Sequence, residues 1–407
     1  MTTGGSGELV RRPSGSTRAT LLELLFDVVF VAALALISMQ LADRGSWPGI
    51  APVVLMLMAV WWTWSITSTT TDFYDPDQRP IQAILMVTML GAVVTAASLA
   101  ADAHPLVFAV GYVVPHLFRG VVLVSVLHLR RHQAEERAAR FFFWFLVSGV
   151  FWIGGALLPD AVRWTVWTVA VTIDYVSAAV RYPTPRLGRV PNMQYERTTA
   201  HLGERYQQFV ILALGDVILV PTLEISRADF TGARSIAFLA AFATMLLLWQ
   251  IYVLGAGEIA RTTAPRVLRR ATRLAPYTHL AMLSGVVGIA AGFDLVVERP
   301  TGDTPARWIG LILGGPALFL LGRTVFTYRI LGTMPWHRVV WLLVLVAAMP
   351  WLGRWPPVLV TAFVVLVLAG VVVGDAMRGR STGPRSRSRS GAGGPRDHPG
   401  ATAGQSG

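Results

Sequence analysis

The sequence predicts an all-α fold, a polytopic transmembrane helix bundle of about 12 spans. Of its 407 residues, 54% are hydrophobic and 14% are charged, whereas a soluble domain carries about 25% charged residues. The hydrophobic residues form blocks that are separated by Arg-rich or Pro/Gly-rich breaks. Each block is close to the roughly 20 residues that a helix needs to cross a bilayer. This combination is typical of a multi-pass membrane protein.

Twelve segments are expected to span the membrane, and the distribution of Arg orients them. The predicted spans are residues 20–41, 48–70, 80–101, 105–128, 141–158, 161–180, 203–222, 233–255, 275–297, 307–331, 338–353 and 356–375. With the N-terminus inside, Arg119, Arg205 and Arg323 are counted within spans, and any other Arg within three residues of a span end is counted with the adjacent loop. The inner segments then hold 25 Arg and the outer loops hold 7. Cytoplasmic loops carry such an excess of basic residues. Both termini are therefore expected to be cytoplasmic.

The two halves of the chain resemble each other. Glu23 opens the first span as Glu204 opens the seventh, and a shift of 187 residues lays Trp62 on Trp249. The offset grows along the chain, as insertions in loops would make it. With six spans in each half, the copies would be parallel and related by an axis along the membrane normal. The sequence therefore predicts a 6+6 parallel internal duplication.

This duplication sets the expected domain organisation. Residues 18–200 form the first six-helix half together with an inner linker, and residues 201–378 form the second half. The segments 1–17 and 379–407 consist largely of Gly, Ser, Pro and Arg. Because they contain almost nothing to bury, both are expected to be disordered tails.

Composition excludes several classes of function. The chain has no Cys, so it has neither disulfides nor thiol chemistry. The net charge of +12 comes from Arg in short loops and tails, which favours attraction to membrane lipids over nucleic acid binding. A phosphate-binding loop, a potassium filter and the Arg repeat of a voltage sensor are all absent from the sequence. No cofactor and no metal is expected, and a homo-oligomer is compatible with the sequence.

The first span contains two acidic residues, Glu23 and Asp27. A carboxylate at membrane depth costs from ~3 to more than 10 kcal/mol. Because the two residues are four positions apart, they share one face of a helix. That face must point into a protein interior that supplies hydrogen bonds, cations or water, which indicates an ion or proton site. The alternative is a structural role, in which both acids interact with the N-terminal end of the helix dipole.

The most specific block opens the seventh span, HLGERYQQFVILALGD. Its polar residues His201, Glu204, Arg205 and Gln208 follow the spacing i, i+3, i+4, i+7, which places them on one helix face. Asp216 follows Gly215, beyond the midpoint of the span. These residues are candidates for a proton or substrate site. A buried structural ion pair between Glu204 and Arg205 is the alternative.

Other polar residues inside spans are weaker candidates. Asp174 has no basic neighbour in sequence, so it is expected either to be protonated or to pair with Arg119 or Arg323. His116 and His279 are expected to be hydrogen-bonded core residues more often than ligands.

The second span carries an aromatic band and is followed by charged residues. Trp61, Trp62 and Trp64 are expected to serve in an interfacial belt and in helix packing, with an aromatic lining for a cation as the alternative. Asp72 and Arg79 are expected in the following inner loop, where they are either solvated residues or a gate for an inner opening.

Three stretches, ELLFDVVFV, HLGERYQQFVILALGD and YTHLAMLSGVVGIAAG, together resemble the low temperature requirement A (LtrA) family of bacterial membrane proteins. The residues that match the family pattern are Glu23, Phe26, Asp27, His201, Glu204, Arg205, Phe209, Gly215 and His279. Tyr206 stands where the family usually has His, and Asp216 replaces the usual Glu. A proton relay that needs this His is therefore in doubt here. The resemblance implies a protein of the bacterial inner (plasma) membrane. It assigns no reaction, because the family is named for a growth phenotype.

Two hypotheses of different classes follow, and transport is preferred to catalysis. In the first, the chain is a proton-linked secondary transporter of a small solute, with Glu23, Asp27, Glu204 and Asp216 exchanging protons beside Arg205. In the second, it is a membrane-embedded acid–base enzyme, an isomerase or cyclase acting on a lipid or isoprenoid. A membrane adaptation factor without turnover is a third alternative.

Overall fold

The computed structural model describes residues 9–11, 18–43, 47–100, 104–191, 200–227, 229–260 and 265–381. Apart from two isolated bridges, the regular secondary structure in these residues is helical. Of the predicted tails, residues 1–8, 12–17 and 382–407 lie outside the described residues.

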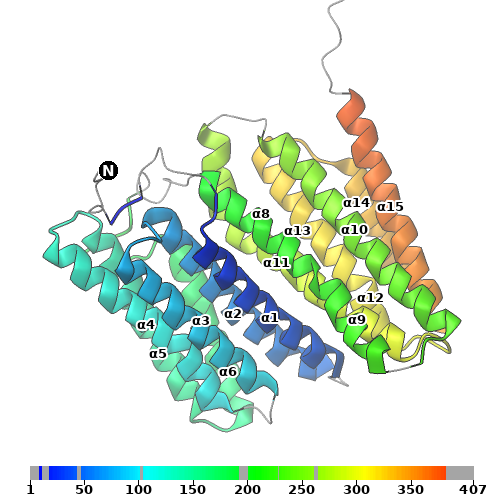
Figure 1. Ribbon diagram of the computed structural model, residues 1–407, viewed down its shortest axis with the longest axis horizontal. Helices are drawn as coiled ribbons and strands as arrows, with labels where there is room; N and C mark the ends of the chain where they lie inside the picture. Colours follow the sequence, from blue (N-terminus) through cyan, green and yellow to red (C-terminus); the bar gives the residue numbers. More distant parts are fainter. Residues whose placement is uncertain are drawn as a thin grey trace, which may run out of the picture.

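Two groups of helices lie side by side in Figure 1, one at each end of the long axis. The first group contains α1 (Leu21–Asp43), α2 (Trp47–Phe73), α3 (Arg79–Ala100), α4 (Pro105–Leu129), α5 (Glu135–Ala156) and α6 (Asp160–Ala179). The second contains α8 (Ala200–Leu214), α9 (Asp216–Arg227), α10 (Gly232–Ala260), α11 (Pro265–Glu298), α12 (Ala306–Ile312), α13 (Gly314–Leu331), α14 (Trp336–Ala348), the 3₁₀ turn η1 (Leu352–Arg354) and α15 (Pro357–Ser381). The first group contains residues of the first predicted half and the second group residues of the second, and the division into two domains stays a prediction.

Every predicted span overlaps one helix or two consecutive helices, α8–α9 for the seventh and α12–α13 for the tenth, although α14 ends at Ala348, before the predicted end of the eleventh span. In the described part of the chain, ten helical segments are long and apolar enough to cross a membrane. The other two predicted spans correspond to α6 and α14. Helix α6 carries charged residues at both ends of its first turn and again at Asp174. Helix α14 has 13 residues, so it is about 20 Å long, whereas the hydrocarbon core of a bilayer is about 30 Å thick. The count of twelve spans stays a prediction.

Helix α1 lies at the junction of the two halves. It packs against α2 and α3 in its own half and against α8, α9 and α11 in the other. Three contacts join α1 to α8–α9, namely Glu23 with His201, Asp27 with Arg205 and Ser38 with Asp216, and each spans 178 residues of sequence. A constant separation means that the two helices run parallel in one register over their whole length.

Each half also contains one helix pair in very close contact. A Cβ atom added at Gly91 of α3 would lie 2.6 Å from the Gly111 carbonyl oxygen of α4, and one added at Gly285 of α11 would lie 2.6 Å from the Gly315 carbonyl oxygen of α13. Small residues allow such an approach of helix backbones in membrane proteins. The repeated glycine contact and the parallel α1/α8–α9 register agree with an internal duplication, which stays a prediction.

Two sequence-based interpretations change with the structure. Trp61, Trp62 and Trp64 are at most 2% exposed. Of the two roles expected for this aromatic band, they therefore serve in helix packing and not in an interfacial belt. Residues 9–11 fall in the segment predicted to be disordered, yet Leu9 is buried and the Arg11 backbone N–H donates to the Phe73 carbonyl. These three residues gain order because they cover the end of α2.

Candidate functional site

The start of α1 combines a helix cap with an interhelical contact. The Thr20 backbone N–H donates to the Glu23 carboxylate at 2.9 Å, and the Glu23 N–H donates to the Thr20 hydroxyl at 3.3 Å. This reciprocal pair is a capping box, which satisfies two free donors of the first helical turn. The same Glu23 oxygen lies 3.3 Å from His201 Nε2 on α8. Glu23 therefore has the structural role considered for it and also takes part in the contact between the halves.

One turn further into α1, Asp27 binds Arg205 of α8 in a bidentate ion pair. The two guanidinium-to-carboxylate distances are 2.9 and 2.8 Å, and both residues are 0% exposed. Trp64 Nε1 of α2 donates to the same carboxylate at 2.8 Å. Two parallel charge-assisted bonds fix the orientation of both side chains. This pair joins α1 to α8 across the contact between the two helix groups.

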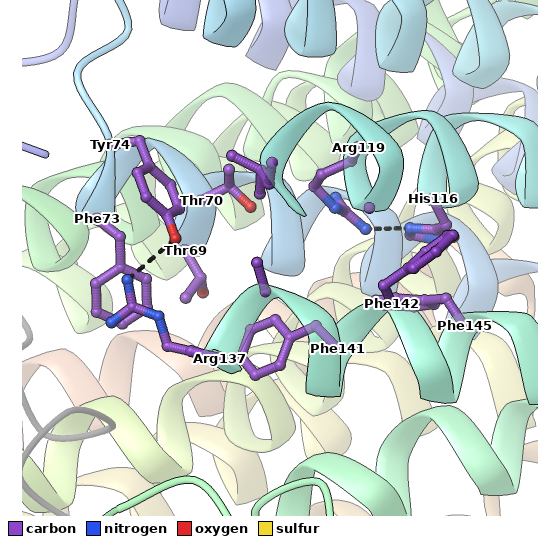
Figure 2. A pocket seen from close by; sticks show the side chains of 13 residues that line it. Thr69, Thr70, Phe73, Tyr74, His116, Arg119, Arg137, Phe141, Phe142 and Phe145 are labelled. Atoms are coloured by element: carbon purple, nitrogen blue, oxygen red, sulfur yellow. Dashed lines mark hydrogen bonds between the residues drawn. The ribbon is translucent and has the colours of Figure 1, made fainter. Parts of the chain in front are cut away.

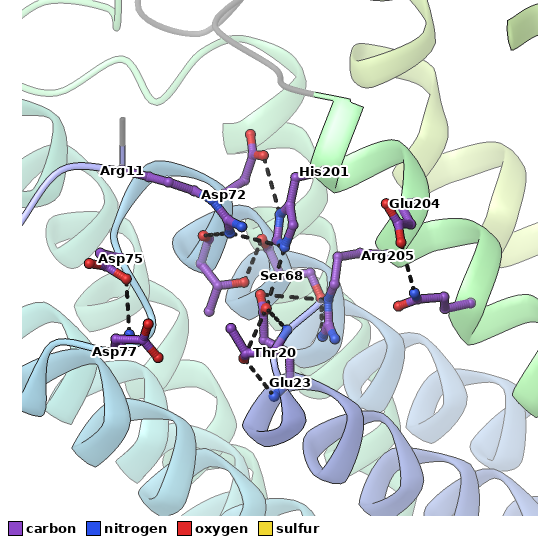
Figure 3. A network of polar contacts seen from close by, with 12 residues as sticks. Arg11, Thr20, Glu23, Ser68, Asp72, Asp75, Asp77, His201, Glu204 and Arg205 are labelled. Carbon is purple, nitrogen blue, oxygen red and sulfur yellow. Dashed lines mark hydrogen bonds and ion pairs between the residues drawn. The ribbon is translucent and has the colours of Figure 1, made fainter. Parts of the chain in front are cut away.

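Charged groups lie near both ring nitrogens of His201. Arg11 lies 3.0 Å from Nε2, on the side also approached by Glu23, and Asp72 at the end of α2 lies 3.6 Å from Nδ1. Figure 3 shows the ring between these groups. A neutral ring can accept from Arg11 at Nε2, whereas a protonated ring can donate from both nitrogens to carboxylates. Nε2 therefore has a hydrogen-bond partner in either protonation state, whereas Nδ1 lies beyond hydrogen-bond distance of Asp72.

We call Arg11, Glu23, Asp27, Asp72, His201 and Arg205 the junction network. All except Arg11 are buried, and they come from the N-terminal segment, α1, α2 and α8. Sequence reasoning found most of these residues but missed the contribution of Arg11 and of the indole of Trp64. Neither has a local signal, because one lies in a Gly/Ser-rich tail and the other in an aromatic band.

The predicted helix face of α8 divides between two environments. His201 and Arg205 face α1, whereas Glu204 lies away from the network (Figure 3) and accepts a hydrogen bond from the Gln208 amide at 3.2 Å. The polar stripe is roughly 100° wide, so its two edges meet different neighbours. The alternative of a buried Glu204–Arg205 pair is wrong, since Arg205 pairs with Asp27 and Glu204 is half-buried.

Asp216 lies apart from the junction network. It is the first residue of α9, eleven positions beyond Arg205, which corresponds to about 16 Å of helix. Its carboxylate accepts a hydrogen bond from Ser38 of α1, and its second oxygen has no partner among the described residues. The structure therefore does not bring Asp216 into one site with Glu23 and Asp27.

Asp174 does not form the ion pair considered for it. Its carboxylate accepts from the Tyr112 hydroxyl at 2.7 Å and from Trp152 Nε1 at 3.3 Å. Neither Arg119 nor Arg323 lies within ion-pair distance of it in the described structure. Neutral donors from α4 and α5 take the place of the expected cation.

The two buried histidines inside spans are hydrogen-bonded core residues, as the core interpretation predicts. His279 Nδ1 donates to the Ala275 carbonyl at 3.0 Å, and its Nε2 lies 3.2 Å from the Tyr252 hydroxyl. His116 contacts Thr63 and Arg119. Tyr206, which replaces the usual family histidine, packs on His279 and bonds Ser65 through its hydroxyl at 2.8 Å.

A cavity of about 50 Å³ lies beside the junction network. Its wall includes Asp72, Ser65 and Tyr206, together with aromatic side chains such as Trp62 and Tyr182. Asp72 belongs to both the network and the cavity, so a molecule in the cavity would touch a group that interacts with His201. In the described residues, no group of three His, Asp or Glu side chains is arranged to hold a metal ion.

The fold and this site define a helical membrane protein with a buried acid–base network at the junction of two helix groups. The chain belongs to the bacterial low temperature requirement A protein (LtrA) family, whose model matches residues 18–373. It is also 29% identical to a protein of Rhizobium meliloti (strain 1021), described as uncharacterized, over 371 residues that cover 89% of this chain and 90% of that protein. No solved structure matches this chain.

Proposed function

We propose that the chain is a proton-linked secondary transporter of a small solute in the bacterial inner membrane, with both termini in the cytoplasm. One observation supports this most strongly: the fully buried pairs Glu23–His201 and Asp27–Arg205 join the two halves of the molecule. In both pairs α1 contributes the acid and α8 contributes the base. The excess of Arg in the inner segments supports the orientation.

The pairs would couple a proton to the relative position of the halves. When Asp27 is ionised, it attracts Arg205 across the junction in a medium of low dielectric constant. When Asp27 is protonated, that attraction is largely lost and the contact between α1 and α8 weakens. A proton would thereby shift the population between a closed and a separated junction, as a ligand shifts a two-state equilibrium.

His201 and Asp72 would link the network to the solute. Asp72 lines the cavity and lies 3.6 Å from His201 Nδ1. A solute that hydrogen-bonds Asp72 would change the partners available to the imidazole. Because His201 Nε2 has a hydrogen-bond partner in either protonation state, the imidazole can gain or lose a proton while that nitrogen stays hydrogen-bonded.

The test is solute-dependent proton movement in liposomes that contain the purified protein and a trapped pH-sensitive dye. Benzoate, succinate, choline and glucose are added in turn, with protein-free liposomes as the baseline. The wild type is expected to move protons with at least one of these solutes, and Asp27→Asn is expected to reduce that movement at least tenfold. Asp375→Asn is the matched control, because Asp375 is a buried acid paired with Arg338 away from the junction. Equal movement by Asp27→Asn and the wild type, or none with the whole panel, contradicts the proposal.

One observation favours the acid–base enzyme as a second candidate. Asp72 lines a cavity to which six aromatic side chains contribute, and such rings can stabilise a cation formed by protonation of an isoprenoid. The purified protein in detergent, without any gradient, would then convert an isoprenoid such as squalene to an isomer detectable by mass spectrometry. The Asp72→Asn variant would lose this conversion, and absence of product with the wild type contradicts this candidate.

A further inference from the structure

Two buried arginines line a second cavity, which lies between α2, α4 and α5. Arg119 of α4 and Arg137 of α5 are 4% and 7% exposed. Figure 2 shows them at the two ends of the cavity. The α5 residues of the wall run from Arg137 to Phe145, which corresponds to about 12 Å along the helix. We call this space the two-arginine cavity.

Neither guanidinium has a carboxylate partner within 4 Å among the described residues. Arg119 donates to the Thr67 hydroxyl at 2.9 Å, contacts His116 and lies over the Phe145 ring. Arg137 donates to the Tyr74 hydroxyl at 3.2 Å and stacks on the Phe73 ring at 3.9 Å. Each therefore retains N–H groups without a charged acceptor.

This lack of a carboxylate partner distinguishes the two residues from three other buried arginines. Arg205 pairs with Asp27, Arg338 pairs with Asp375, and Arg140 pairs with Glu136 on the same helix as Arg137. An unpaired buried cation is costly unless something compensates its charge. Two such cations that face one cavity indicate that an anion completes the site.

The shape and walls of the cavity narrow the choice of anion. The cavity volume is about 20 Å³, little more than one water needs, so it admits only a small charged group. A carboxylate is planar and matches the donor fork of a guanidinium. Between the arginines the wall is apolar, with Leu123, Phe141 and Phe142. That surface suits a hydrocarbon or aromatic body attached to the acid.

The geometry points to the two-arginine cavity as the binding site for the carboxylate of an apolar monocarboxylic acid. It shares Thr69, Phe73 and Phe141 with the cavity beside the junction network, so these side chains separate a bound acid from Asp72. That this acid is the transported solute rests on the proposed function, whereas its binding does not. The acid can be a water-soluble molecule or a fatty acid from the membrane, since both present the same group.

The experiment measures thermal unfolding of the full-length protein in a neutral detergent. Sodium benzoate and sodium palmitate are the probes, and benzamide and sodium chloride are controls for shape and ionic strength. The wild type is expected to be stabilised by at least one carboxylate and by neither control. In Arg119→Gln and Arg137→Gln, the Kd of that carboxylate is expected to rise at least tenfold.

Arg140→Gln is the matched control, because Arg140 is a buried arginine on α5 that already has an acidic partner, so it should keep the wild-type Kd. The variants also report on folding. Removing an unpaired buried charge should leave the melting temperature without ligand unchanged or raised, whereas loss of a purely structural arginine would lower it. If Arg119→Gln does not fold, Arg137→Gln decides the question alone.

Stabilisation by benzoate supports a soluble acid, and stabilisation by palmitate alone supports a lipid acid. Absence of any carboxylate effect on the wild type overturns the inference, as does an unchanged Kd in the arginine variants. Because no gradient is used, failure here is distinguishable from failure of the transport proposal, for which proton movement by Asp27→Asn is the measure.

Discussion

Replacement of Arg205 by Met should reveal how strongly the junction network holds the two halves together. Asp27 and Arg205 are 0% exposed and form a bidentate pair. Without the guanidinium, Asp27 keeps only the Trp64 donor, and Glu23 loses a cation at 3.9 Å. Removing one partner of a buried ion pair costs about 3–5 kcal/mol. We expect Arg205→Met to lower the free energy of unfolding by that amount.

A double-mutant cycle isolates the pair from other effects of the substitution. Asp27→Leu alone should also be strongly destabilising, because it leaves a buried guanidinium without its carboxylate. The double variant Asp27→Leu/Arg205→Met removes both charges and should recover about 2–3 kcal/mol relative to the sum of the single variants. Reversible unfolding of the protein in mixed micelles supplies the four free energies. If the two single effects add to within about 0.5 kcal/mol, the two residues act independently and the reasoning about the junction is wrong.

Two further predictions concern the close contact between α11 and α13 and the indole bond to Asp27. Gly285→Leu places side-chain atoms where a Cβ alone would lie 2.6 Å from the Gly315 carbonyl oxygen. Circular dichroism melts should therefore show a free energy of unfolding lowered by about 1–3 kcal/mol or more. Gly154→Ala is the control and should have little effect, because a Cβ there meets nothing within 4 Å. Trp64→Phe keeps an aromatic ring but removes the 2.8 Å indole hydrogen bond to Asp27. In the same assay it should lower the free energy of unfolding by about 1–3 kcal/mol. A Trp64→Phe variant as stable as the wild type would show that the indole N–H is not needed to hold the carboxylate.

The local pattern of the sequence predicts the helices well because it depends on neighbouring residues only. Apolar blocks and the breaks between them locate all twelve predicted helical segments, and the spacing of Glu23 and Asp27 places both on the buried face of α1. The motif around His201 and Arg205 indicates a polar face on α8. The cost of burying charge then requires each face to meet a partner.

The choice of partner is decided by the tertiary structure. Periodicity fixes which side of a helix is polar but not which helix faces it, so Arg205 could be assigned to Glu204 as readily as to Asp27. Packing α1 parallel to α8 with a separation of 178 residues selects Asp27 and brings Glu23 to His201.

Long-range packing also decides the remaining members of the site. Arg11 reaches His201 from a segment without any structural pattern, and the carboxylate of Asp174 bonds Tyr112 and Trp152 instead of an arginine. The sequence by itself determined that this is a membrane protein with acids and bases on buried helix faces. Only the packing of helices far apart in the chain decided which of them meet, because contact between distant segments depends on the summed fit of whole helix surfaces and leaves no local signal.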